Sequence, residues 1–335
     1  MNAGRRIGNS RRGRGAALLA AMLTVALVAT FAAASLWQQW RSVEVEAAER
    51  ARVQAAWVLT GALDWARLLL REDGRTPGID HLGEPWAVPL QDARLSSFLA
   101  ADPNNSADTG EQVLEAFLSG QITDLQSRLN VNSLIDGGNR SPYDVLAFTR
   151  LFQLLGLPPG QIDLLVENLR LARSTDNVNA SGAATPLAPQ RTEDLVWLGL
   201  PAATVTALRP YVTVLPLHTT INLNTASAQV ISASIDGLGL ADAQRLVAAR
   251  ERSPFKTVAD AKLAIGAPDA IFPANPPGIG VASQFFEVRA RLRLDQLVVE
   301  ERSVVQRNGM EVTTLQRERG TPDPTAPTQQ AAQLR

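Results

Sequence analysis

An uninterrupted apolar run near the N-terminus constrains this chain more than any other feature. Residues Ala16 to Leu36 contain no charge, no proline and no glycine. As an α-helix rising ~1.5 Å per residue, this run would span roughly 30 Å, which matches the hydrocarbon core of a bilayer. The sequence therefore predicts one membrane crossing.

The residues before the apolar run favour a defined orientation. Five arginines and no acid lie before residue 15: Arg5, Arg6, Arg11, Arg12 and Arg14. Positive flanks stay in the cytoplasm, so we expect a cytoplasmic N-terminus and an exported body. The alternative is a cleavable secretory signal, because Ala32 and Ala34 form a small-residue cleavage pattern that would leave Ser35 as the mature N-terminus.

Helical character continues beyond the apolar run without proline or glycine for some twenty residues. Apolar residues then recur at alternating steps of four and three, which is the stripe of a helix that packs on another surface. The stripe consists of Ala51, Ala55, Val58, Ala62, Trp65 and Leu69. We expect one helix from about Ala16 to Leu70, and this continuation argues against a cleaved secretory signal.

Composition excludes several classes of function. Removing the five leader arginines from a chain of formal net charge −1 leaves −6, which has the wrong sign for a protein that binds nucleic acid phosphates. The chain has no cysteine, so it can form neither a disulfide nor a thiolate metal site. Its two histidines, His81 and His218, lie far apart, and neither a nucleophile elbow nor a P-loop is present. We therefore expect no enzymatic activity.

The exported body alternates between two kinds of pattern. After a turn-rich stretch, a short extended segment is expected around Trp86 to Leu90, followed by a long and mostly helical region. From Phe285 the period changes to two, and Asn308-Gly309 predicts a hairpin between two further strands. The residues beyond these strands have the composition of a disordered tail.

Three stretches of the helical region share one pattern. Each begins with Gly-Leu, at Gly156, Gly199 and Gly237, and continues into a helix with apolar residues at offsets six and nine. Those apolar residues are Ile162 and Leu165, Val205 and Leu208, and Ala243 and Leu246. The pattern predicts repeated helix-turn-helix units.

The leader resembles the signal of type IV pilins and pseudopilins. By that resemblance a prepilin peptidase cuts after Gly15, Ala16 becomes the methylated first residue, and the apolar helix is retained. Most of that family has glutamate at the fifth mature position, where this chain has Ala20. Because a carboxylate in lipid needs a neutralising partner, its absence suits a subunit at the end of a filament.

Several segments in the same order resemble the K-type minor pseudopilins of type II secretion (general secretion pathway protein K). These segments are "DHLGEPWAVPL", "ITDLQSRLNVNSL", "PYVTVLP" and "INLNTA". The matching motif residues are Asp80, Glu84, Trp86, Asp124, Asn130, Asn132, Asn222 and Asn224. The resemblance implies an α+β fold, in which a long N-terminal helix and a small antiparallel sheet are interrupted by a large all-α insert of helix-hairpin-helix (SAM-like) units.

The expected division of the chain follows from these patterns. It comprises a leader (1–15), a transmembrane segment (16–36), a periplasmic helix (37–75), a pilin body (76–129 and 280–319), two inserts (130–215 and 216–279) and a tail (320–335). The resemblance implies a single-pass inner-membrane protein with a periplasmic body, which caps or initiates the pseudopilus and supports protein export. The implied partners are the I- and J-type minor pseudopilins, the major pseudopilin, the inner-membrane platform, the prepilin peptidase and exported proteins.

Two further expectations concern ligands. The hairpin near "INLNTA" also resembles that of competence-type DNA receptors, so a membrane-anchored DNA receptor is the alternative function. Asp236 and Asp242 flank the hairpin and would repel phosphate, so protein packing is favoured over DNA binding. No cofactor is required, but oxygen-rich turns at Asp80 to Glu84, Asp124 to Asn132 and Asp136 to Asp144 have the ligand types of Ca²⁺, with no assignable ligand set. The alternative is that these side chains form Asx-turns and helix caps.

Overall fold

The structure is a computed structural model of the 335-residue chain. It describes residues 10–75, 78–95, 116–173, 186–269, 271–273, 276–294 and 297–320, with side chains from residue 16 onward. Most of the predicted leader and all but the first residue of the predicted tail lie outside the described residues. The chain forms two compact units, Met1–Val58 and Leu59–Arg335.

The first unit is built from α1 (Ser10–Asp73), one continuous helix that extends into the second unit. The helix is long and apolar enough to cross a membrane from Ala16 onward. Its apolar run contains two threonines, and each hydroxyl donates to a carbonyl one turn earlier: Thr24 to Ala21 and Thr30 to Leu27, both at 2.8 Å. These bonds satisfy the polar groups within the helix, as a lipid environment requires.

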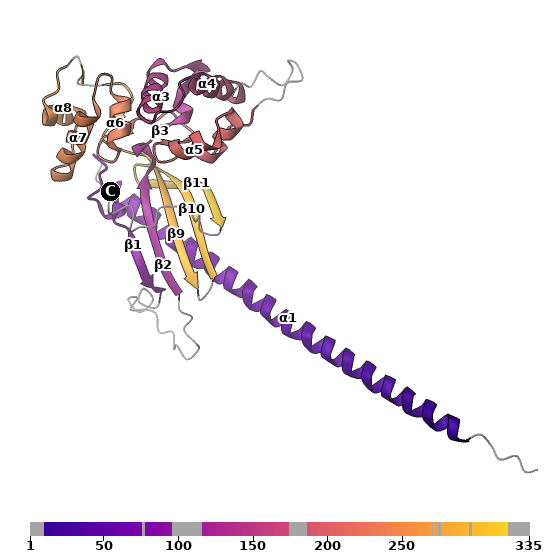
Figure 1. The fold of residues 1–335 in the computed structure, drawn as a ribbon. Coiled ribbons are helices and arrows are strands. Elements are labelled where there is room, and N and C mark those ends of the chain that lie inside the picture. The colour runs from indigo at the N-terminus through magenta and orange to yellow at the C-terminus, as the bar shows by residue number, and fades with distance from the viewer. Residues whose placement is uncertain are drawn as a thin grey trace, which may run out of the picture. The chain divides into compact units, whose positions relative to one another are not determined.

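The second unit contains a five-stranded antiparallel sheet in the order β1-β2-β9-β10-β11 (Figure 1). Its strands are β1 (Leu90–Arg94), β2 (Ala116–Asp124), β9 (Phe285–Leu294), β10 (Leu297–Asn308) and β11 (Glu311–Gly320). The predicted alternation is confirmed, because all five apolar residues of β9 from Phe286 to Leu294 are buried. The predicted hairpin at Asn308-Gly309 is also confirmed, since it joins β10 to β11.

The last part of α1 packs on one face of this sheet. Leu63, Ala66 and Leu70 form a core with Trp86 and with side chains of the strands. Those strand residues are Ile122, Phe286, Val288, Val305 and Val312. Arg67 reinforces the contact, because its guanidinium donates to the carbonyl oxygen of Val312 at 2.8 Å.

The packing stripe predicted for this helix is partly wrong. Within the second unit the buried positions are Leu59, Leu63, Ala66 and Leu70, about one residue from the predicted register. Trp65 is 60% exposed, whereas Ala62 and Leu69 are half-buried at the margins. Of the other predicted positions, Ala55 is buried and Ala51 and Val58 are half-buried. Two neighbouring stripes of this helix show the same spacing of four and three. The stripe that covers the sheet is the one that contains three leucines, Leu59, Leu63 and Leu70.

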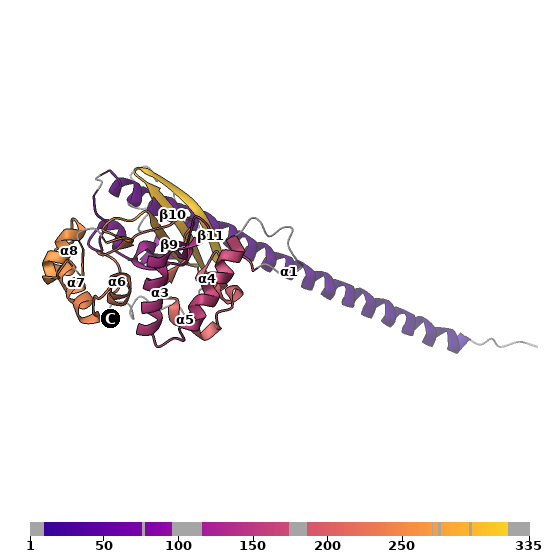
Figure 2. The same ribbon diagram turned by 90° about the horizontal axis from the view of Figure 1, so that it is seen from above.

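The helical insert leaves the sheet after β2 and rejoins it before β9 (Figures 1 and 2). Its longer helices are α3 (Pro142–Leu154), α4 (Gly160–Arg173), α5 (Ala202–Leu208), α6 (Ala228–Ser234), α7 (Leu240–Arg252) and α8 (Val258–Ile265). Short 3-10 turns are η2 (Leu125–Ser127), η3 (Val131–Leu134) and η5 (Thr192–Leu198). Short strands are β3 (Leu129–Asn130), β4 (Ile135–Asp136), β5 (Asn139–Arg140), β6 (Val212–Thr213), β7 (Ile221–Asn222) and β8 (Ile279–Gly280).

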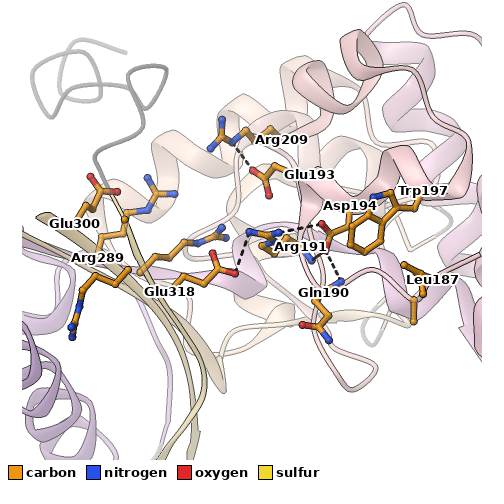
Figure 3. A pocket seen from close by; sticks show the side chains of 14 residues that line it. Leu187, Gln190, Arg191, Glu193, Asp194, Trp197, Arg209, Arg289, Glu300 and Glu318 are labelled. Carbon is orange, nitrogen blue, oxygen red and sulfur yellow. Dashed lines mark hydrogen bonds and ion pairs between the residues drawn. The ribbon is translucent and has the colours of Figure 1, made fainter. Parts of the chain in front are cut away.

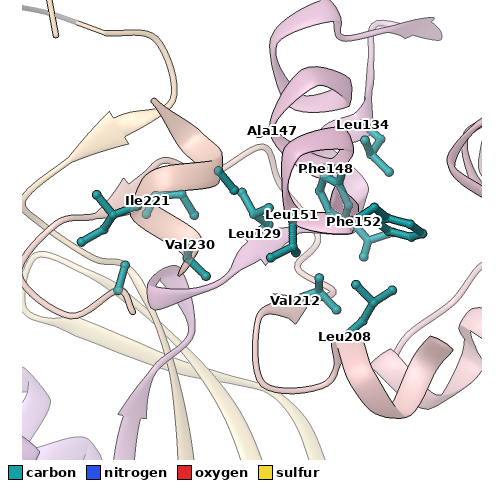
Figure 4. Packing of buried hydrophobic residues seen from close by; sticks show 14 of the residues in the cluster. Leu129, Leu134, Ala147, Phe148, Leu151, Phe152, Leu208, Val212, Ile221 and Val230 are labelled. Carbon is teal, nitrogen blue, oxygen red and sulfur yellow. The ribbon is translucent and has the colours of Figure 1, made fainter. Parts of the chain in front are cut away.

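One hydrophobic core runs through the whole insert (Figure 4). It joins Phe148 and Phe152 of α3 to Leu208 of α5 and Val230 of α6. The six apolar residues predicted for the three repeated units all belong to this core. The glycine that opens each unit has a positive φ of 65°, 87° or 74°, a conformation that glycine adopts without strain.

Two local predictions differ from the structure. The segment predicted as extended from Trp86 begins as a 3-10 turn, η1 (Pro85–Ala87), and strand β1 starts only at Leu90. The turn forms because Pro85 suits the first helical position and the Glu84 carboxylate accepts a bond from the Trp86 indole at 2.7 Å. Strand β2 is the second difference, since it falls in the region expected to be mostly helical.

Candidate functional site

A buried polar cluster lies where the insert leaves and rejoins the sheet. Five segments that are distant in sequence meet there, and we call their assembly the junction. Its central residues are Asp80 before η1, Asp124 at the end of β2, Asn222 in β7, Ser283 before β9 and Arg307 near the end of β10. The first four side chains are buried.

Asp124 accepts hydrogen bonds from both the sheet side and the insert side. Its Oδ2 accepts from the hydroxyls of Thr225 at 2.5 Å and Ser283 at 2.6 Å, and from the Asn222 amide at 3.2 Å. Its Oδ1 accepts from the backbone N–H of Gln126 at 2.7 Å. One carboxylate therefore connects β2, the insert and the segment that leads into β9.

Burial raises the pKa of Asp124 to about 6. The hydroxyls of Ser283 and Thr225 and the Gln126 N–H favour the charged form, while the nearby charge of Asp80 adds to the upward shift. Desolvation is the largest of these effects, as expected for a carboxyl removed from water.

Asn222 uses both ends of its amide within the junction. Its nitrogen donates to the Asp80 carbonyl at 3.0 Å and to the Ser283 hydroxyl at 2.9 Å, in addition to Asp124. Its oxygen accepts from the backbone N–H of Asn224 at 2.9 Å. Asparagine suits this position because a single planar group supplies donors to one side and an acceptor to the other.

Arg307 closes the junction on the sheet side. Its guanidinium pairs with Asp80 at 2.5 Å and with Asp73 at the end of α1, and it lies over the Phe286 ring with 5.0 Å to the centroid. Asp80 also accepts from the backbone N–H of Ser283 at 2.7 Å. Burial raises the pKa of Asp73, and the positive charge of Arg307 opposes that shift.

The carboxylates of Asp73, Asp80 and Glu84 come close enough to suggest a metal site, with one oxygen of each within 4.8 Å of the others. However, Arg307 already pairs with two of them. Glu84 accepts bonds from the Trp86 indole at 2.7 Å and the His81 N–H at 3.0 Å. The geometry fits a structural ion pair in which the guanidinium supplies the positive charge.

The remaining motif asparagines fasten segments within the insert. Asn130 donates to the Leu217 carbonyl at 2.7 Å and accepts from the Leu215 N–H at 3.0 Å. Asn132 donates to the Leu215 carbonyl at 2.9 Å. Asn224 both donates to and accepts from the backbone of Phe255, at 3.0 and 2.9 Å. Each asparagine thus holds a stretch of backbone that is distant in sequence.

The structure gathers most of the predicted motif residues in one place. Asp80, Glu84, Trp86, Asp124 and Asn222 lie in or beside the junction, and Asn130, Asn132 and Asn224 form the backbone clamps. Sequence reasoning missed Ser283, Thr225 and Arg307; of these, only Thr225 lies in a quoted motif. Gly15, Ala16 and Ala20 lie in α1, and their roles in processing and assembly stay predictions.

Comparison with known proteins assigns the family. Two family models, both described as type II secretion system (T2SS), protein K, match residues 127–217 and 221–282. A type II secretion system protein K of Pectobacterium carotovorum subsp. carotovorum is 27% identical over 341 residues, covering 92% of this chain and 97% of the relative. The protein K of Pseudomonas aeruginosa is 30% identical over 273 residues, covering 75% of this chain and 76% of the relative.

The chain belongs to the type II secretion system protein K family. The fold agrees, because the crystal structure of the GspK-GspI-GspJ complex from enterotoxigenic Escherichia coli matches with a TM-score of 0.60. That match is 19% identical in sequence and covers 82% of this chain and 99% of the other. The boundary between the two family models, near residues 217–221, falls where Asn130 clamps the backbone.

Membership in the protein K family makes this chain a minor pseudopilin of type II secretion, and a DNA receptor is not favoured. The hairpin agrees with this assignment. Asp236 pairs with Arg150 at 2.9 Å, and Asp242 pairs with Arg245. Asp236 therefore takes part in an ion pair with α3, and Asp242 in one within α7.

Proposed function

We propose that this protein K caps the pseudopilus. The supporting observation is that the insert projects from the end of the sheet that lies beside the C-terminal end of α1. Along the second unit, Thr60 bonds Arg317 of β11, whereas Asp73 at the end of α1 pairs with Arg307. The insert emerges from Asp124, which pairs in register with Phe286 at that same far end. The bulk of the insert thus lies beyond the end of α1 (Figure 1).

A subunit with this arrangement would occupy the place of any subunit added beyond it. Each new subunit would join the filament at its membrane end, beneath the subunits already assembled. A protein whose insert blocks the opposite end could therefore only be the first subunit of the filament. Ala20 supports the same position, since no preceding subunit would supply an amine to neutralise a glutamate there. The chain would thereby initiate the filament that supports protein export.

Partners would contact the face of α1 that the sheet leaves uncovered. On that face Trp65 and Leu68 are exposed, and a Cβ added at Gly61 would have no heavy atom within 4 Å. A helix with apolar residues on two opposite faces is suited to packing between two surfaces. The related complex contains GspI and GspJ, so we infer that equivalent helices of other minor pseudopilins cover this face, with the major pseudopilin further along the filament.

Processing and topology follow from the same proposal. A prepilin peptidase would cut after Gly15, leaving a methylated Ala16, a cytoplasmic N-terminus and a periplasmic body attached to the inner-membrane platform. The two inserts would be helix-hairpin-helix units divided near residue 215, with the pilin body on either side. Exported proteins would meet the insert at the filament tip.

Mass spectrometry of the mature N-terminus tests the pseudopilin processing. We expect Ala16 as the first residue; Ser35 or an uncut Met1 would overturn the proposal. Immunogold labelling of pseudopili tests the cap, with label at one end of each filament as the expected result. Label distributed along the length would contradict it.

The partner face has a matched test on the full-length protein in detergent. Trp65→Ala with Leu68→Ala should abolish co-purification with the other minor pseudopilins. Leu263→Ala, which changes an exposed leucine on α8, should leave co-purification unchanged. Equal binding by both variants would move the interface elsewhere.

Calcium binding by the insert stays a prediction without an assigned ligand set. Calorimetric titration of chelator-treated protein with CaCl₂ measures it directly. Saturable heat, together with a higher melting temperature in calcium than in magnesium, is the expected result. A titration without saturable heat would rule the ion out.

A further inference from the structure

Ion pairs occupy a groove of about 810 Å³ between the sheet and the insert (Figure 3). Arg191 bridges its two sides, because it pairs with Asp194 of η5 at 3.6 Å and with Glu318 of β11 at 3.5 Å. The other arginines that line the groove also pair with carboxylates, and those of the sheet share the buried Glu287 and Glu301. The groove therefore fastens the insert to the sheet, and the exposed aromatic side chains of α1 are the stronger candidate for an unassigned contact.

Two neighbouring tryptophans follow the apolar run of α1. Trp37 and Trp40 are 65% and 58% exposed, and their ring centroids lie 5.4 Å apart with the planes tilted by 42°. A spacing of three residues places both rings on one side of the helix. The pair lies in the first unit, so it belongs neither to the core beneath the sheet nor to the partner face at Trp65 and Leu68.

The length of the apolar run fixes where this pair falls. No charged residue lies between Arg14 and Arg41, and the run from Ala16 to Leu36 spans the hydrocarbon thickness of roughly 30 Å. Trp37 and Trp40 then lie ~1.5 and ~6 Å beyond the hydrocarbon. The headgroup layer is roughly 5–7 Å deep on each side of a bilayer. Both rings therefore fall within that layer.

The chemistry of the indole suits that layer. The ring is apolar, and its N–H needs a hydrogen-bond acceptor, so tryptophan is enriched where hydrocarbon meets headgroups and water. Every side chain that the structure describes from Ala16 to Arg50 is exposed, which leaves the two rings open to lipid. Trp57 is also exposed, at 72%, but it lies 17 residues beyond Trp40, or ~25 Å along the helix.

We propose that Trp37 and Trp40 bind the phospholipid headgroup region at the periplasmic side and hold α1 at a fixed depth in the membrane. Outward movement of the helix would transfer two indoles from this layer to water. Inward movement would bring the indole N–H groups and Arg41 into hydrocarbon, where polar and charged groups are costly. The inference rests on the retained apolar helix of the proposed function, but not on the capping role.

Fluorescence quenching by brominated lipid tests the contact. The full-length protein is reconstituted into phosphatidylcholine liposomes with bromines either near the headgroup end or near the methyl end of the acyl chains. Bromines near the headgroup end should quench part of the tryptophan emission, and Trp37→Phe with Trp40→Phe should abolish that quenching. Trp57→Phe is the matched control and should leave the quenched part unchanged. Quenching that persists in the double variant, or that is equally strong with bromines at the methyl end, would overturn the proposal.

Cysteine labelling tests whether the pair fixes the depth, because the chain has no native cysteine. Ser35→Cys lies just inside the predicted hydrocarbon, so an impermeant maleimide reaches its thiol only when the helix moves outward. Trp37→Ala with Trp40→Ala should widen the range of depths and speed the labelling of Ser35→Cys in liposomes at least about threefold, since the thiolate reacts only in water. Trp57→Ala should leave the rate unchanged. An equal rate with and without the tryptophan pair would refute the fixed depth.

The two proposals fail in different ways. A chain cut before Ser35 would not float with the liposomes, and that result would overturn the retained helix together with this inference. Protein that floats with the liposomes but shows no quenching of Trp37 and Trp40 would overturn the lipid contact alone. Such a result would instead place the two rings against neighbouring helices.

Discussion

Replacing Asp124 by asparagine should remove a specific pH dependence from the stability of the second unit. The pKa of this carboxyl is about 6 in the folded chain, against 3.8 for the free group. The folded state therefore holds the proton more tightly than the unfolded state does. The resulting stability is fully present below pH 3.8 and is lost as the pH rises through 6.

The magnitude follows from the size of the shift. A difference of about two pKa units corresponds to about 3 kcal/mol, at 1.36 kcal/mol per unit. The amide introduced by Asp124→Asn would keep a carbonyl oxygen as the acceptor for the Gln126 N–H. Its NH₂ would face the hydroxyls of Ser283 and Thr225, which can rotate to accept. The Asn222 amide would lose this acceptor but keep the Asp80 carbonyl and the Ser283 hydroxyl. The variant should therefore fold without the titration of residue 124.

Urea unfolding of the full-length protein in detergent, followed by tryptophan fluorescence at pH 4, 5, 6 and 7, measures the effect. Relative to wild type, Asp124→Asn should gain about 2 kcal/mol between pH 4 and pH 7, because pH 4 already lies above the free-group pKa of 3.8. Asp136→Asn, which changes an exposed carboxylate, should follow the wild-type profile. If Asp124→Asn and wild type show parallel pH profiles, the burial of Asp124 does not control its titration.

Two further substitutions test the junction and the insert core. Asn222→Ala should destabilise the protein by about 3 kcal/mol, because Asp124 and the Asp80 carbonyl lose a buried donor; thermal unfolding measures this loss, and a change below about 1 kcal/mol would contradict it. Leu165→Ala should cost about 2–5 kcal/mol by leaving a cavity, whereas Leu164→Ala beside it on the exposed side should cost much less. If urea unfolding showed equal losses of stability for the two variants, Leu165 would not belong to the core.

Periodicity predicted the sheet only where apolar and polar residues alternate without interruption. In β9 the buried residues alternate with charged ones, so the strand and its hairpin partners could be recognised. Strand β2 lies between β1 and β9, and Ala116, Leu118 and Ile122 are buried on one of its faces. An apolar Phe117 on the other face and a buried Asp124 interrupt the alternation of apolar and polar residues. Gly120 in this strand adds a further interruption, although a Cβ there would lie 3.1 Å from the Arg289 carbonyl.

The junction could be predicted as a set of residues but not as a site. Asp80, Asp124 and Asn222 each lie in a recognisable motif, and nothing in local spacing indicates that they touch. Their contacts close long loops, since Asn222 is 98 positions from Asp124 and 142 from Asp80. Ser283 completes the cluster from a segment without any sequence signal. Only the pairing of β2 with β9 in the folded sheet brings Asp124, at the end of β2, next to the segment that precedes β9.

The polar side chains of the junction lower the stability of the protein, and the place of the junction between two paired strands explains why they are nevertheless suited to it. Asp124 would favour its neutral form, so the charged carboxylate opposes folding at neutral pH. Apolar side chains in the same space would give the folded protein greater stability. However, they form no directional bonds, so they would allow the packed segments to shift relative to one another. The insert departs and returns between two paired strands, β2 and β9, whose register must be kept. Hydrogen bonds from Asn222, Ser283 and Thr225 to one carboxylate are satisfied together in a single arrangement, which fixes the insert at the end of the sheet, as the proposed cap requires.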